Sequence, residues 1–147
     1  MTTKPQARRV LVLCTGNSAR SQMAEALFNA RGGGTIVASS AGSRPAPRVN
    51  PYAVRALKEI GIDWAGHEPR SVDEFLGERF DLVITVCDNA KEACPIFPGA
   101  PQMLHWGMDD PAEAEGSDRE KARAFASTRD RLVAHIDDLL RNKFATG

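Results

Sequence analysis

Short apolar runs recur along the chain and predict buried strands. Residues 8–13 (RRVLVL) and 81–86 (DLVITV) show the pattern most clearly, because apolar and β-branched residues dominate both runs. Residues 35–40 and 102–106 show the same pattern more weakly. The segments between these four runs have a different periodicity. This indicates that strands alternate with helices.

Three kinds of signal predict helices in those segments. Apolar residues recur at helical spacing over 23–30, and the glycines of 32–34 end that helix. Asn50 followed by Pro51 is typical of an N-cap and a first helical turn. Capping boxes at 71–74 and 117–120 begin a short helix and a long one. The predicted apolar stripes are Val54, Leu57 and Ile60 after Pro51, and Ala122, Phe125, Leu132, Ile136 and Leu139 in the long helix, extending toward Phe144.

The alternation predicts an α/β fold in which residues 1–147 form a single domain. We expect a three-layer sandwich with a four-stranded parallel sheet flanked by helices on both faces. In such sheets ligands bind at the carboxyl ends of the strands. Three of the predicted ends fall at Cys14, Cys87 and Trp106, so we expect the functional site there.

Composition narrows the range of partners. The chain has 19 basic and 19 acidic residues and a formal net charge of zero, so no overall field attracts it to nucleic acid or to an acidic membrane. No apolar run approaches the roughly 20 residues of a membrane span, and residues 1–9 lack an apolar signal core. We therefore expect a cytoplasmic monomer. Trp64 and Trp106 are expected to pack rather than to stack on nucleic-acid bases, since basic clusters do not adjoin them.

Three cysteines in a small chain of the reducing cytoplasm indicate chemistry or core packing rather than structural disulfides. Cys14 opens a short polar segment between the first strand and the first helix. Gly16 and Asn17 tolerate the backbone angles of a tight turn, whose amides can form an anion-binding nest. Arg20 offers a planar fork to a tetrahedral oxyanion, and Ser21 can donate its hydroxyl to the sulfur. The predicted oxyanion-binding residues are Thr15, Gly16, Asn17, Ser18, Ala19, Arg20 and Ser21.

These surroundings favour the thiolate form of a cysteine and hence a nucleophile. The alternative is a buried cysteine that ends a strand, with Arg20 solvated on the helix. The segment 14–25 (CTGNSARSQMAE) closely resembles the catalytic loop of low-molecular-weight protein tyrosine phosphatases and, still more, that of the arsenate reductases that share their fold. The resemblance extends through Ser40-Ala41-Gly42, Asn50-Pro51, Cys87, Cys94-Pro95 and His105-Trp106-Gly107-Met108-Asp109-Asp110-Pro111. It implies the fold of that family and an arsenate-reducing enzyme.

The resemblance also assigns an acid and a thiol relay. The aspartate before proline is the general acid of the family, and Asp110 matches it, with Asp109 as the near rival and a capped turn as the alternative. By resemblance, Cys14 attacks arsenate, Cys87 attacks the Cys14 sulfur with release of arsenite, and Cys94 then attacks Cys87. Core packing of Cys87 and Cys94, or a metal site that they form with His105, are the other interpretations.

The expected partners are arsenate, with phosphate and sulfate as competing oxyanions, and thioredoxin as reductant; a glutathione–glutaredoxin system is the alternative reductant. No cofactor or metal is expected. Some related reductases hold potassium behind the loop, and Asn17, Glu25 and Ser40 match its ligands, but Arg70 stands where an acidic ligand would be expected. The rival functions are a phosphatase acting on phosphotyrosine or small phosphomonoesters, and a non-enzymatic anion sensor.

Overall fold

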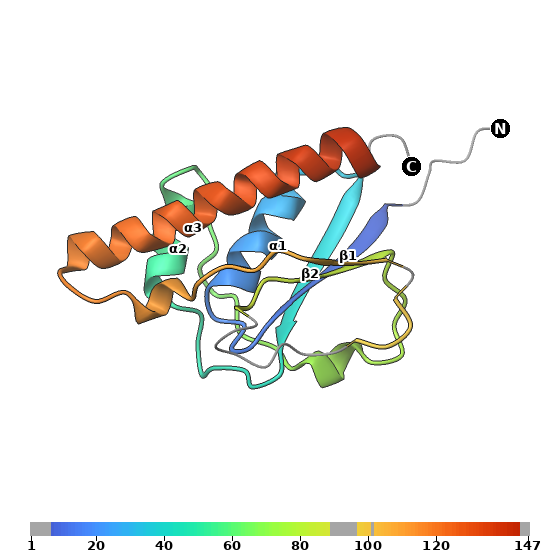
Figure 1. The fold of residues 1–147 in the computed structure, drawn as a ribbon, viewed down its shortest axis with the longest axis horizontal. Helices are drawn as coiled ribbons and strands as arrows, with labels where there is room; N and C mark the ends of the chain where they lie inside the picture. The colour runs from blue at the N-terminus through green and yellow to red at the C-terminus, as the bar shows by residue number, and fades with distance from the viewer. Residues whose placement is uncertain (1–6, 89–96, 101, 145–147) are drawn as a thin grey trace.

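A computed structural model describes residues 7–88, 97–100 and 102–144 of the chain, without the side chains of 143 and 144. Its centre is a four-stranded sheet in the order β2-β1-β3-β4, in which every neighbouring pair is parallel (Figure 1). The four predicted strands are all present. Their bounds are β1 (Arg8–Cys14), β2 (Ile36–Gly42), β3 (Leu82–Thr85) and β4 (Met103–His105).

The register of the sheet brings the carboxyl ends of three strands together. Cys14 at the end of β1 pairs with Gly42 at the end of β2. On the other side of β1, Leu13 pairs with Thr85, the last residue of β3. Because parallel strands end at the same edge, the loops that follow β1, β2 and β3 share one rim of the sheet.

Three α-helices cover one face of the sheet: α1 (Arg20–Arg31), α2 (Pro51–Lys58) and α3 (Asp118–Leu139). They bury Val10 and Val12 of β1 in the larger core cluster. The opposite face carries Leu11 and Leu13, which pack with three phenylalanines, Phe75, Phe80 and Phe97. Phe75 belongs to the short 3₁₀ helix η1 (Val72–Phe75). Helices on both faces are therefore confirmed, with the long helices on one side and η1 on the other (Figure 1).

Two helix predictions need correction. Helix α1 begins at Arg20, three residues before the predicted start, because the loop turns directly into the helix. Helix α2 ends at Lys58, so Ile60 lies outside it and is 43% exposed. The buried residues of α2 are Ala53, Ala56 and Leu57. The chain leaves the helix through Gly61, whose φ of 86° ends the helical path.

Helix α3 follows its prediction closely. The Ser117–Glu120 capping box is formed, and Phe125, Leu132, Ile136 and Leu139 are buried. Ala122 is only half-buried. The helix continues into a π-helical turn, η3 (Leu140–Phe144), and the predicted contact of the Phe144 side chain lies outside the described residues.

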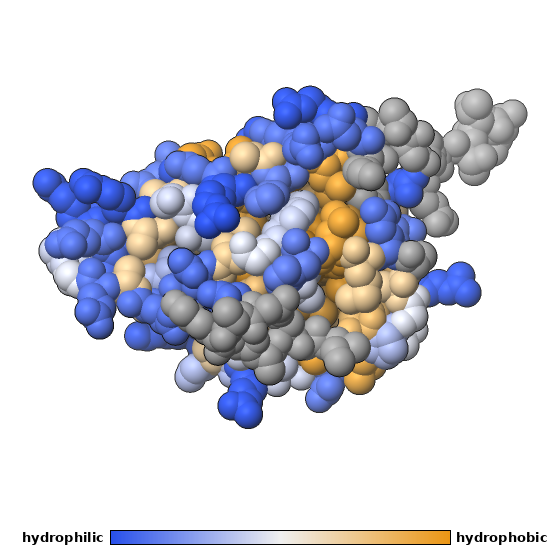
Figure 2. Space-filling model, in the orientation of Figure 1, coloured by the Kyte–Doolittle hydropathy of each residue, from blue (hydrophilic) through white to orange (hydrophobic). Residues whose placement is uncertain are grey.

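One end of the second sheet face is thinly covered. Val37 on β2 and Met103 on β4 are 52% and 49% exposed. In the view of Figure 2, apolar residues gather on the right-hand part of the molecule and hydrophilic residues dominate the left-hand end. Within the described part of the chain, no helix has the length and apolar character to cross a membrane.

Candidate active site

The turn between β1 and α1 points its donors at the Cys14 sulfur. Cys14 ends β1, α1 begins at Arg20, and Cys14 is 2% exposed. The backbone N–H of Asn17 donates to Sγ at 3.2 Å, and the Ser21 hydroxyl lies 2.8 Å from Sγ. Cys14 is a free thiol. A free thiol at a strand end, with a backbone N–H and a hydroxyl directed at its sulfur, makes Cys14 a candidate nucleophile.

Asn17 holds the turn in an unusual conformation. Its φ is 50°, which makes it the one non-glycine residue with positive φ in the described part of the chain. Asparagine tolerates the left-handed region better than most residues. Its fully buried side chain donates to the hydroxyls of Ser21 and Ser40 at 2.8 and 2.9 Å. The amide therefore ties the turn both to α1 and to β2.

The segment after β2 supports the loop from outside. Gly42 lies so close that a Cβ there would come within 3.0 Å of the Asn17 nitrogen, so only glycine fits this strand end without a shift. The backbone amides of Arg44 and Ala46 donate to the carbonyls of Thr15 and Gly16, each at 2.9 Å. These carbonyls face the 44–46 segment. These two bonds fix the outer side of the turn, opposite in direction to the Asn17 N–H that donates to Cys14 Sγ.

Arg20 connects the loop to the segment that carries the predicted acid. Its side chain is 3% exposed, Nη1 donates to the Met108 carbonyl at 3.1 Å, and Nη2 lies 3.8 Å from Oδ2 of Asp110. Asp110 also accepts the N–H of Ala112 at 2.9 Å and caps the 3₁₀ turn η2 (Pro111–Glu113). Asp110 therefore forms the capped turn of the alternative interpretation and also lies beside Arg20, as the acid interpretation requires. Asp109 is exposed.

Cys87 follows β3 on the same rim as Cys14. The backbone N–H of Val86 donates to the Leu13 carbonyl at 3.0 Å, which places the chain before Cys87 beside the end of β1. Cys87 is fully buried and disulfide-bonded, whereas Cys14 is free, so these two cysteines are not joined to each other. Cys94 lies outside the described residues.

His105, the histidine of the metal interpretation, lies beside a hydroxyl group. Nδ1 of His105 lies 2.7 Å from the Thr85 hydroxyl. Across residues 7–88, 97–100 and 102–144, no group of three His, Cys, Asp or Glu residues is placed to hold a metal ion. The alternative also involved Cys94, which is outside those ranges.

A buried polar network behind the loop was not foreseen from the sequence. Nε2 of Gln22 donates to Oδ1 of Asn17 at 3.0 Å, and Nε1–H of Trp64 donates to Oε1 of Gln22 at 2.8 Å. Trp64 is buried, as its predicted packing role requires, and its ring is stacked on His67. A glutamine on the inner face of α1 was the available signal, since a buried amide needs partners.

The side chains that match potassium ligands do not fit a cation here. Oδ1 of Asn17 already accepts hydrogen bonds from Gln22 and from the backbone N–H of Arg70 at 2.7 Å. The Ser40 hydroxyl donates to Glu25 at 2.7 Å and accepts from Asn17. Burial raises the pKa of Glu25, against the lowering effects of Ser40 and the nearby charge of Arg70. The Asn17 and Ser40 oxygens and one Glu25 oxygen therefore already accept hydrogen bonds, and the positive charge of Arg70 is close to Glu25.

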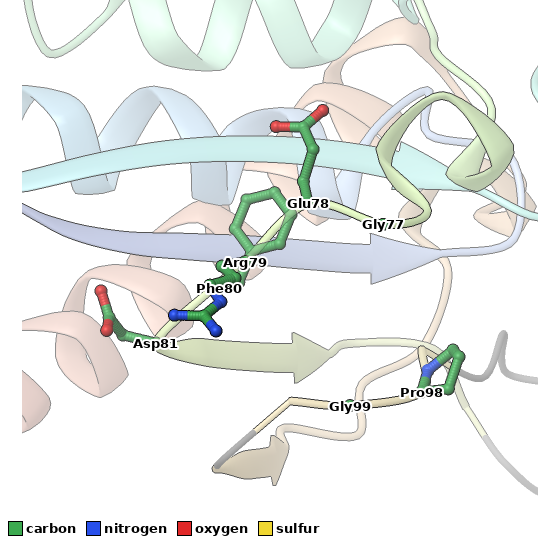
Figure 3. A pocket seen from close by; sticks show the side chains of 7 residues that line it. All are labelled: Gly77, Glu78, Arg79, Phe80, Asp81, Pro98 and Gly99. Atoms are coloured by element: carbon green, nitrogen blue, oxygen red, sulfur yellow. The ribbon is translucent and has the colours of Figure 1, made fainter.

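A cleft lies along the segment that joins η1 to β3. It has a volume of about 510 Å³ and is lined by Gly77, Glu78, Arg79, Phe80, Asp81, Pro98 and Gly99. Figure 3 shows the first five on the segment that leads into β3, and Pro98 and Gly99 on the segment that precedes β4. Asp81 directly precedes β3, whereas Cys14 is the last residue of β1, so Asp81 and the thiol lie at opposite ends of parallel strands.

A cysteine at the end of a buried strand, a loop amide that donates to its sulfur, a buried arginine and an adjacent aspartate are the groups that suit nucleophilic attack on a tetrahedral oxyanion. The low molecular weight phosphotyrosine protein phosphatase family matches residues 9–145, and the chain belongs to that family.

Similar proteins within the family are arsenate reductases. The arsenate reductase of Halalkalibacterium halodurans is 46% identical over 127 residues, which cover 86% of this chain and 91% of that protein. The crystal structure of arsenate reductase from Archaeoglobus fulgidus has a TM-score of 0.69 at 36% identity and covers 87% of this chain and 98% of its own. A thioredoxin-dependent arsenate reductase of Corynebacterium glutamicum has a TM-score of 0.63 at 27% identity. The match covers 92% of this chain and 64% of that protein's chain.

Proposed function

We propose that this chain reduces arsenate to arsenite, with Cys14 as the nucleophile and Cys87 and Cys94 as the following thiols. The observation that carries the proposal is the position of Cys14 Sγ, which receives the Asn17 N–H and lies beside the Ser21 hydroxyl, one strand away from the segment leading to Cys87. The similarity to named arsenate reductases supports the choice of substrate. A phosphatase needs Cys14 but gives no role to the other two cysteines.

The first step is nucleophilic substitution at arsenic. The amides of 15–21 and the Arg20 guanidinium hold the oxyanion, and the Cys14 thiolate forms a sulfur–arsenic bond while one arsenic–oxygen bond breaks. Hydroxide is a poor leaving group, so the departing oxygen takes the Asp110 proton and leaves as water. The Asp110 carboxylate lies 3.8 Å from Arg20, which would grip the same anion.

The next steps transfer two electrons to arsenic. Cys87 thiolate attacks the Cys14 sulfur, the sulfur–arsenic bond breaks, and its electron pair stays with arsenic, which leaves as arsenite. Cys94 then attacks Cys87 and releases Cys14.

Thioredoxin is the proposed reductant, because its dithiol reduces accessible disulfides and because a structural neighbour is a thioredoxin-dependent arsenate reductase. Phosphate and sulfate are proposed as competing oxyanions, since they share the tetrahedral shape and charge that the loop recognises. We propose a cytoplasmic monomer with residues 1–147 acting as one domain. Weak phosphomonoester hydrolysis is proposed as a side activity, because Cys14, Arg20 and Asp110 suffice for its first step.

The test follows arsenite formation with purified thioredoxin, thioredoxin reductase and NADPH, beside phosphomonoester hydrolysis, in the parent and each Cys→Ser variant. We expect C14S to lose both activities. C87S and C94S should lose multiple-turnover reduction, and C94S should stop after one turnover with a Cys14–Cys87 disulfide. Sustained turnover by C94S contradicts the relay. Efficient phosphomonoester hydrolysis without arsenite formation favours the phosphatase.

A further inference from the structure

The hydrogen bonds behind the anion loop form one continuous path from an indole to the reactive sulfur. Trp64 donates to Gln22, Gln22 donates to Asn17, and Asn17 donates to Ser21, whose hydroxyl lies 2.8 Å from Cys14 Sγ. Trp64 is 7% exposed, Gln22 2%, and Asn17 and Ser21 are fully buried. Buried polar groups of this kind are costly to leave unpaired, so each partner constrains the next.

The donor and acceptor in each of these hydrogen bonds follow from groups that can only donate or only accept. An indole N–H can only donate, so Gln22 must present its carbonyl oxygen to Trp64. The Gln22 nitrogen, turned the other way, donates to the Glu68 carbonyl at 3.2 Å and to Oδ1 of Asn17. The backbone N–H of Arg70 also donates to that oxygen. These partners all lie on 64–70, and together they assign the orientation of both amides.

The orientation of Asn17 decides what Ser21 can do. The two hydrogens of the Asn17 amide are used on the hydroxyls of Ser21 and Ser40. Ser21 therefore accepts from Asn17, and its single hydroxyl hydrogen is left for Cys14 Sγ. A donor at 2.8 Å stabilises the sulfur when it is negative. A reversed Asn17 amide would let Ser21 donate elsewhere and would remove that stabilisation.

We propose that Gln22 and Trp64 are positioning residues for the nucleophile: Trp64 orients the Gln22 amide, and Gln22 orients Asn17 so that Ser21 donates to Cys14. The proposal rests on the proposed role of Cys14. Gln22 and Trp64 act through the hydroxyl hydrogen that Ser21 donates to the Cys14 sulfur, and hence on the reactivity of Cys14 at mildly acidic pH.

The test measures iodoacetamide alkylation of Cys14, followed by peptide mapping, from mildly acidic to alkaline pH. In Gln22→Met we expect Cys14 to react about three- to tenfold more slowly at mildly acidic pH, a change of the size that loss of one hydrogen bond produces, and at the parent rate at alkaline pH. Trp64→Phe should show a smaller shift in the same direction. Tyr52→Phe is the matched control, because it removes one donor from a ring whose hydroxyl bonds Asp118 outside this network.

The double variant Gln22→Met with Trp64→Phe separates positioning from general weakening. Because Trp64 acts through Gln22, adding Trp64→Phe to Gln22→Met should change the acid-side rate no further. Acid-side rates at the parent level in both single variants, or equal slowing at every pH, would overturn the proposal. If Gln22→Met does not fold, the acid-side alkylation rate of Cys14 in Trp64→Phe tests the proposal by itself. Failure of the proposed function is seen separately, as a parent Cys14 without selective reactivity or without arsenite formation.

Discussion

At the scale of single residues, Asp110 makes a capping contact and also lies beside Arg20. One carboxylate oxygen caps η2 through the N–H of Ala112, and the other lies 3.8 Å from Arg20. The cap fixes the position of the side chain, and the arginine brings it to the anion loop. A carboxyl group that is held in place and half-buried beside the site is suited to protonate a leaving oxygen.

Asp110→Asn tests the acid without removing the cap, because asparagine caps helical turns about as well as aspartate. An amide has no proton to give, so we expect kcat for arsenate to fall by about 10²–10⁴-fold. Folding stability should change little. Asp109→Asn is the matched control and should keep the parent kcat. Steady-state rates and thermal unfolding measure both, and a near-parent kcat in Asp110→Asn would remove Asp110 from the acid role.

At the scale of elements, α1 and α3 are joined by a bidentate ion pair at the end of α1. Arg31 donates from Nε and Nη2 to the two oxygens of Asp137, each at 2.6 Å. Hydrogen bonding to Arg31 lowers the pKa of Asp137. The pair is partly exposed, with side chains 39% and 32% accessible, so its contribution is modest.

The pH dependence of stability follows from this lowered pKa. The carboxylate stabilises the folded chain above the pKa that Asp137 has when unfolded, and this contribution disappears as the pH falls through the lower folded value. Asp137→Asn should therefore destabilise the protein by about 0.5 kcal/mol near neutral pH and have no effect in strong acid. Urea unfolding at a series of pH values measures this. A constant difference at every pH would contradict the ion-pair origin.

At the scale of the whole molecule, the chain has no net charge, so the proposed anion site depends on local groups rather than on the overall field. The strand ends, the loop amides and the buried Arg20 meet on one rim, and this arrangement exists only in the folded state. A ligand that binds only the native state shifts the folding equilibrium toward it.

Sulfate and phosphate should therefore stabilise the folded protein. At about 100 times the dissociation constant, the expected gain is about 2.7 kcal/mol, which raises Tm by several degrees for a chain of this size. Arg20→Lys should reduce the shift, because a lysine cannot grip two oxygens at once. Sodium chloride at matched ionic strength is the control for salt effects. An equal rise in Tm with chloride would show that the loop is not the binding site.

Local patterns in the sequence were sufficient for the strands, the capping boxes and the loop at Cys14, because each depends on neighbours within a few residues. Burial periodicity was less reliable where a helix was short: Ile60 lies beyond α2, and the start of α1 was set by the turn rather than by apolar spacing.

The tertiary structure alone decided which groups from distant segments meet. Trp64 and the Arg70 backbone reach Gln22 and Asn17 across more than 40 positions, and the Asp110 segment reaches Arg20 across 90. No periodicity along the chain encodes such contacts, since they arise when the loops after parallel strands gather at one edge. The sequence by itself therefore determined the candidate residues and the local turns. The packing of distant segments determined the direction of each hydrogen bond around the sulfur.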